Sequence, residues 1–209
     1  MLSTPLRRFV LTTHLTASLG WLGAVVAFLA LSIAGVSSGD AQTVRAAYLM
    51  MELTTWYVIV PFCSAALLTG VVESAGTPWG FFRHYWVITK LGLTVVATIL
   101  LLVHTRPIDQ VAQAASMGSL TASDLRHLRL QLVGDASAAL CVLLVTTVLS
   151  VYKPWGLTPY GIRAQAITGR SNRWSTVARR SAGRYLLIAA FMFVVVIVLL
   201  HLAGMGLRH

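Results

Sequence analysis

The sequence predicts an all-α fold, a polytopic bundle of about five transmembrane helices in a single membrane domain of 209 residues. Hydrophobic residues make up 57% of the chain and charged residues only 11%, whereas a soluble domain carries about 25% charged residues. The mean hydropathy is +0.78. Five apolar runs approach or exceed the roughly 20 residues that a helix needs to cross a bilayer. A chain of this composition needs lipid around it, because its own polar residues are too few to cover its apolar ones.

The five predicted spans follow one another without an internal repeat or a low-complexity tract. They are residues 9–36, 49–72, 86–104, 131–152 and 184–205. The first follows Arg7 and Arg8, as in a signal peptide, but it exceeds the roughly 7–15 apolar residues of a signal sequence. We therefore expect it to be a permanent helix. The second span contains Pro61, which should kink it near the middle because proline lacks the backbone N–H.

The connections contain signals for helix ends and for close packing. Residues 37–40 (SSGD) fit a capping box, so the second helix should begin near Asp40. Residues 121–124 (TASD) offer a similar start for the fourth helix, and residues 105–130 are expected to form a loop. The first span carries the small-residue pairs Gly20 with Ala24 and Gly23 with Ala27, whose spacing favours close helix contacts.

The distribution of Lys and Arg predicts the orientation. With the N-terminus in the cytoplasm, the inside segments hold ten of these residues and the outside segments five, with Lys90 inside a span. This excess predicts an N-in, C-out, multi-pass protein of the cell membrane, either an inner or a plasma membrane. An aromatic belt is expected at the inner boundary, formed by Trp79, Tyr85, Trp86, Tyr152, Trp155 and Trp174.

The most basic stretch is the cytoplasmic loop 153–183. It should attract anionic lipid, and a docking surface for a partner is the alternative. The formal net charge of +10 is explained by topology rather than by a nucleic-acid partner. The two cysteines, Cys63 and Cys141, lie inside apolar runs without a CxxC motif, so we expect them to pack as small hydrophobic residues.

Two ionisable residues lie within the inner half of the predicted spans. His14 is about one and a half turns into the first helix, and Lys90 is about one turn into the third. Both helices run outward, so the two residues should reach similar depth, near His84 and Glu73. An intramembrane lysine needs a carboxylate, a carbonyl or an acidic ligand group as its partner. The alternative is that Lys90 extends to the cytoplasmic interface.

A second group of polar residues is predicted near the outer face. His104 ends the third span, His201 lies near the end of the fifth, Glu52 starts the second and Asp135 lies early in the fourth. Glu52, His104 and His201 are candidate metal ligands, with copper as one option because imidazole suits it. A haem site with two histidine ligands and a proton relay are further alternatives, as is a set of interfacial residues in contact with water.

The first and third spans resemble a group of small membrane proteins. The first reads HLTASLGWLGA from His14 to Ala24, and the third reads WVITKL from Trp86, followed by an apolar run to His104. This pattern is similar to the CopD copper-resistance proteins, the HemJ protoporphyrinogen oxidases and the DUF2269 proteins, the last being closest in length. The resemblance implies haem b as a cofactor, with His14 as a ligand, Lys90 near a propionate and His104 as the later histidine. His201 is the remaining candidate for a cofactor-binding residue.

One departure from this group limits what the resemblance implies. The HemJ pattern has charged residues just after the first helix, where this chain has residues 34–37 (AGVS). Three functions therefore stand open. The first is haem-based electron transfer or redox chemistry with a redox partner. The second is metal or proton-coupled transport, in which a homo-oligomer would supply further helices. The third is a non-catalytic scaffold or assembly factor. The sequence contains no P-loop, GxSxG or HExxH motif.

Overall fold

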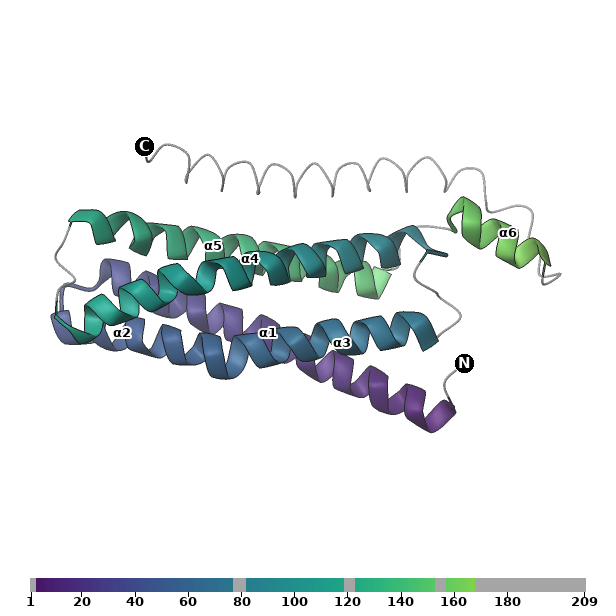
Figure 1. Ribbon diagram of the computed structural model, residues 1–209, viewed down its shortest axis with the longest axis horizontal. Coiled ribbons are helices and arrows are strands. Elements are labelled where there is room, and N and C mark those ends of the chain that lie inside the picture. The colour runs from purple at the N-terminus through teal and green to yellow at the C-terminus, as the bar shows by residue number, and fades with distance from the viewer. Residues whose placement is uncertain (1–2, 77–81, 119–122, 153–156, 168–209) are drawn as a thin grey trace.

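A computed structural model describes residues 3–76, 82–118, 123–152 and 157–167 of the chain. The described part is helical, and its long helices lie side by side along one axis (Figure 1). Four helical segments, Thr4–Ser37, Ala41–Gly76, Tyr85–Ser116 and Arg126–Tyr152, are long and apolar enough to cross a membrane. These segments confirm the first four predicted spans. The fifth predicted span, residues 184–205, lies outside the described residues, as do Trp79, Trp155 and Trp174.

The first helix, α1 (Thr4–Ser37), has 34 residues. It is therefore about 51 Å long at 1.5 Å per residue, well beyond the roughly 30 Å of a hydrocarbon core. Pro5 lies in its first turn, where the missing backbone N–H costs nothing. It ends at Ser37, because Ser38 is extended and returns its N–H to the carbonyl oxygen of Ala34 at 3.0 Å.

The helix α2 (Ala41–Thr54) begins where the sequence predicts but with a different cap. Asp40 is itself the cap, and its carboxylate accepts hydrogen bonds from the backbone N–H groups of Gln42 and Thr43 at 3.3 and 2.9 Å. The capping box over residues 37–40 was therefore the wrong prediction, since Ser37 still belongs to α1. These hydrogen bonds hold the pKa of the Asp40 carboxyl below its usual value.

The second span changes its geometry just before Pro61. A π-helical segment, η1 (Thr55–Ile59), joins α2 to α3 (Val60–Gly76). The N–H of Val60 bonds to the carbonyl oxygen of Thr55, five residues earlier, and Pro61 has no N–H to return to the preceding turn. The expected disturbance near Pro61 is confirmed, and it takes the form of a widened turn.

The third helix is longer than the sequence predicts, whereas the fourth begins early, as the cap signal at residues 121–124 predicts. The helix α4 (Tyr85–Ser116) continues through Pro107, and α5 (Ser123–Tyr152) begins well before its apolar part. The loop expected over residues 105–130 is therefore wrong. The helix α4 continues past its apolar run, which hydropathy alone does not report, and Ile108, Val111 and Ala115 of this extension belong to the core. The described part of the basic loop contains α6 (Pro159–Ile167).

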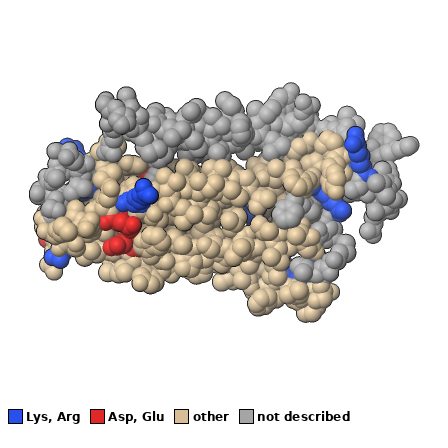
Figure 2. All heavy atoms as spheres, viewed as in Figure 1, with Lys and Arg blue, Asp and Glu red and all other residues tan. Residues whose placement is uncertain are grey.

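The two ends of the bundle are each closed by local contacts, and we name them the Asp40 end and the Arg83 end. At the Asp40 end, Arg45 on α2 donates to the carbonyl oxygen of Ser116 at 3.2 Å. At the Arg83 end, the N–H of Thr158 donates to the carbonyl oxygen of Arg83 at 2.9 Å. Charged side chains gather towards these two ends, with a wide uncharged band between them (Figure 2). That distribution suits a membrane-spanning bundle.

The helices pack through small residues and a continuous apolar core. α1 packs against α2, α3 and α5, and α4 packs against the same three helices. Gly20 lies so close to Phe62 of α3 that a Cβ there would be 2.8 Å from its ring, which confirms the first small-residue pair. The second pair is wrong as a contact, because Gly23 and Ala27 are exposed. The core contains Trp21, Phe28, Tyr48, Met51, Val111 and Leu132.

Candidate functional site

His14 lies on α1 with only 6% of its surface exposed. Its Nδ1 atom is 3.0 Å from the carbonyl oxygen of Ala66 and 3.1 Å from the hydroxyl oxygen of Thr69, both on α3. A carbonyl oxygen only accepts hydrogen bonds, so Nδ1 carries the proton and donates it. The imidazole is thus held in one orientation, and Nε2 is the unprotonated nitrogen of the neutral ring, able to accept a hydrogen bond.

The Nε2 atom of His14 faces Lys90 of α4, whose Nζ atom is 3.1 Å away. The prediction that these two residues reach the same depth is confirmed. The lysine ends at the histidine instead of extending to the interface, so a neutral imidazole is the partner that the sequence left unnamed. Glu73 on α3 adds a favourable Coulomb interaction with the Lys90 ammonium group. His84 lies outside the pair, its ring centroid 6.4 Å from that of Trp86.

The pair can exchange a proton. An ammonium group that donates to a neutral imidazole nitrogen can give up its proton and leave a neutral amine beside an imidazolium. The Nδ1–H group can keep donating to the Ala66 carbonyl oxygen throughout, so the ring does not need to rotate. Lys90 is half-buried between the helices, and an ionisable residue within a membrane span is costly and in most cases functional. The arrangement therefore fits a proton-transfer site within the bilayer.

The surroundings of the pair are small and hydroxyl-rich. A Cβ added at Gly70 would lie 3.1 Å from Cε1 of His14, so glycine is what lets α3 approach the ring. A void of about 30 Å³ adjoins the pair, which is room for a water molecule. Its lining includes the hydroxyl-bearing residues Ser18, Thr94, Thr146 and Thr147.

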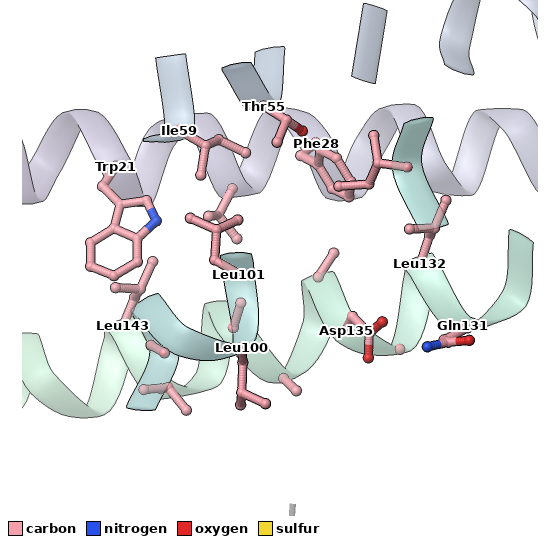
Figure 3. Close-up of a pocket in the computed structure, with 18 of the residues that line it drawn as sticks. Trp21, Phe28, Thr55, Ile59, Leu100, Leu101, Gln131, Leu132, Asp135 and Leu143 are labelled. Carbon is pink, nitrogen blue, oxygen red and sulfur yellow. The ribbon is translucent and has the colours of Figure 1, made fainter. Parts of the chain in front are cut away.

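A much larger cavity begins beyond this void. It has a volume of about 650 Å³ and lies between α1, η1, α4 and α5. Trp21 and Leu143 line both spaces, so they separate the polar pair from the cavity. Figure 3 shows them at one end of the cavity, with Gln131, Leu132 and Asp135 at the other. Asp135 therefore lies at the far end of a mostly apolar cavity, and Trp21 and Leu143 stand between that cavity and the pair.

The predicted outer polar residues are only partly placed. Asp135 lines the cavity, with Oδ2 buried. Glu52 is half-buried on α2 and is not among the described lining residues. His104 lies on α4 with its side chain outside the described part, and His201 lies outside it entirely. Within the described ranges, no three His, Cys, Asp or Glu side chains are grouped to hold a metal ion. The metal site and the convergence of these residues stay predictions.

A second polar cluster, which sequence reasoning missed, lies at the Asp40 end. Arg129 of α5 donates from Nε to the hydroxyl oxygen of Tyr48 at 2.8 Å and from Nη2 to the carbonyl oxygen of Gly35. Its guanidinium carbon lies 5.4 Å from the centre of the Tyr48 ring. The three residues join α1, α2 and α5. Arg129 precedes the predicted fourth span, which starts at residue 131, so in the sequence it resembles an ordinary loop residue. No local signal indicates that it bonds to Tyr48 and Gly35.

Comparisons with known proteins leave the chain without an assigned family. No protein-family model, no curated protein and no solved structure matches it. The resemblance of the first and third spans to the CopD, HemJ and DUF2269 proteins therefore stays a prediction, as do haem b and copper.

Proposed function

We propose that this integral membrane protein moves protons through the His14–Lys90 pair, in support of proton-coupled transport. The observation that supports it is the hydrogen bond of 3.1 Å between Lys90 Nζ and His14 Nε2 inside the bundle. Both groups can hold or release the shared proton, which a purely structural contact does not need. The void of about 30 Å³ beside the pair has room for a water molecule, and Asp135 lines the larger cavity on the other side of Trp21 and Leu143.

The direct test is the substitution His14→Gln. A glutamine amide can still donate to the Ala66 carbonyl and accept from Lys90, but it cannot take up a proton. The purified protein would be placed in liposomes loaded with a pH-sensitive dye, under a pH gradient and with the membrane potential clamped. We expect wild-type proton flux above that of empty liposomes and a loss of about 100-fold in the variant, the scale of a lost acid–base group.

The matched control is His84→Gln, which replaces a histidine outside the pair and should leave the flux unchanged. Melting curves of all three proteins would show whether the substitutions preserve the fold. Wild-type flux equal to that of empty liposomes, or full flux in the His14 variant, would refute the proposal.

Haem b binding is the second candidate, and the cavity of about 650 Å³ supports it, because helix bundles hold haem between facing helices. The residues around His14 do not fit an axial ligand as they stand. Lys90 occupies the direction of the Nε2 lone pair, and the adjoining void is only about 30 Å³. A reduced-minus-oxidised visible spectrum tests this candidate. Haem b bands that vanish in His14→Ala or His104→Ala would support it, and a flat spectrum with ample haem would remove it.

The membrane is proposed to be the cell membrane, with the Arg83 end in the cytoplasm. The charged residues lie towards the two ends of the bundle, which fits a membrane-spanning protein in either orientation. The choice of orientation comes from the Lys and Arg count of the sequence. Labelling of single introduced cysteines at Arg45 and Arg163 with an impermeant thiol reagent, in a background where Cys63 and Cys141 are replaced by Ala, would settle it. Labelling at position 45 in intact cells, without labelling at position 163, is expected.

A further inference from the structure

The cavity of about 650 Å³ has the lining of a binding site for a lipophilic cation. Most of its described lining residues are Leu, Val, Ile or Ala. The polar side chains are few. They include His127, together with Thr55, Gln131 and Asp135, which lie away from the Trp21 end of the cavity (Figure 3). An apolar space with a small number of placed polar groups is the usual form of a small-molecule site.

A carboxylate and two aromatic rings in the cavity wall favour a positively charged ligand. Asp135 supplies a carboxylate, while no Lys or Arg is among the described residues that line the cavity. Trp21 and Phe28 present rings to the same space (Figure 3). A cation is attracted both by a carboxylate and by aromatic faces, and more strongly where water is excluded.

The backbone beside the cavity is also unusual. Thr55 and Ile59, the two buried residues of the π-helical segment η1, both line it. Single π-helical turns inside α-helices occur often at functional sites. Here the widened turn lies across the cavity from α5, which carries Asp135.

We propose that this cavity binds a lipophilic cation, with its charged centre towards Asp135 and its apolar groups towards Trp21 and Leu143. The inference adds a substrate class to the proposed function and rests on it for the transport role, although binding itself can be measured independently. The His14–Lys90 pair lies beyond Trp21, at the other end of the cavity from the carboxylate. Proton uptake would then occur beyond the Trp21 end of the cavity, and cation binding at its Asp135 end.

The experiment measures saturable binding of radiolabelled tetraphenylphosphonium to the full-length protein in lipid nanodiscs. We expect saturable binding to the wild type, at least a tenfold loss of affinity in Asp135→Asn, and a change of less than twofold in the matched control Asp109→Asn. Asp109 accepts a hydrogen bond from Trp56 and is not among the described lining residues. Tetraphenylborate, an anion of the same shape, should not compete.

A second variant tests the location of the site without removing its charge. Ala139→Phe places a large ring in the cavity wall and should abolish binding, with circular dichroism confirming the helical fold. An absence of saturable binding to the wild type would overturn the inference, as would equal competition by tetraphenylborate or unchanged binding in both variants.

His14→Gln should retain tetraphenylphosphonium binding. Binding without proton flux would refute only the proposed function, and proton flux without binding would refute only this inference.

Discussion

The His14–Lys90 pair and the Arg129–Tyr48–Gly35 cluster are both partly buried polar contacts between helices, but their chemistry differs. Arg129 donates to two oxygen atoms, a hydroxyl and a carbonyl, and a guanidinium group does not release its proton in proteins. Lys90 donates to a nitrogen atom that can itself take the proton. The first arrangement can only hold helices together, whereas the second can change its protonation state. The acceptor atom therefore separates a structural contact from a candidate proton-transfer site.

The largest expected effect comes from making the Lys90 site resemble the Arg129 site. Lys90→Arg keeps a positive charge that can donate to His14 but removes the ability to release a proton. We expect proton flux in liposomes to fall by about 100-fold, while the melting temperature stays close to that of the wild type. Wild-type flux in this variant would show that Lys90 acts only as a fixed charge.

The next effect concerns the close contact that completes the other cluster. A Cβ at Gly35 would lie 2.6 Å from Cζ of Tyr48, a ring already held by Arg129. Gly35→Ala should therefore lower the free energy of unfolding by about 1–3 kcal/mol through overpacking. Gly23→Ala is the matched control, since a Cβ there meets nothing within 4 Å. Equal melting temperatures for the two variants would contradict this packing argument.

A smaller effect, on stability, is expected when the opposite substitution is made at the Asp40 end, with lysine in place of Arg129. Arg129→Lys keeps the charge but loses the forked geometry that reaches Tyr48 and Gly35 together. The free energy of unfolding should fall by about 1 kcal/mol, the value of one hydrogen bond, with proton flux unchanged. Chemical denaturation in detergent and the liposome assay measure the two quantities on one preparation. A loss of flux without a loss of stability would reverse the roles that we assign to the two clusters.

The smallest effect concerns Asp40, which is exposed at the start of α2. Its pKa lies below the usual value because the hydroxyl and N–H of Thr43, together with the N–H of Gln42, bond to the ionised carboxylate. The stabilisation is therefore complete above the ordinary pKa of 3.8 and is lost as the pH falls through the lower value of the folded state. Asp40→Asn should lower the melting temperature slightly at pH 7 and by less at pH 3. A difference that grows on acidification would contradict this account.

The sequence predicts the four described spans well because lipid imposes a length and a composition on each of them. It places His14 and Lys90 at one depth because α1 and α4 run in the same direction. It does not predict the contact between them, the Ala66 carbonyl or the role of Gly70, since these depend on how α1, α3 and α4 rotate against one another. The extension of α4 beyond residue 104 was missed, because polar helical turns carry no hydropathy signal. The early start of α5 was predicted, because the cap signal at residues 121–124 is local.

The π-helical segment η1 has a consequence for the angular position of everything that follows it. A π-helical turn carries one residue more than an α-helical turn, and one residue corresponds to about 100° of rotation about a helix axis. Ala66 and Thr69 lie downstream of η1 on α3, and it is their angular position that lets them face His14. Deleting a single residue from η1 would turn the binding partners of His14 away from it while leaving the hydropathy of the span intact.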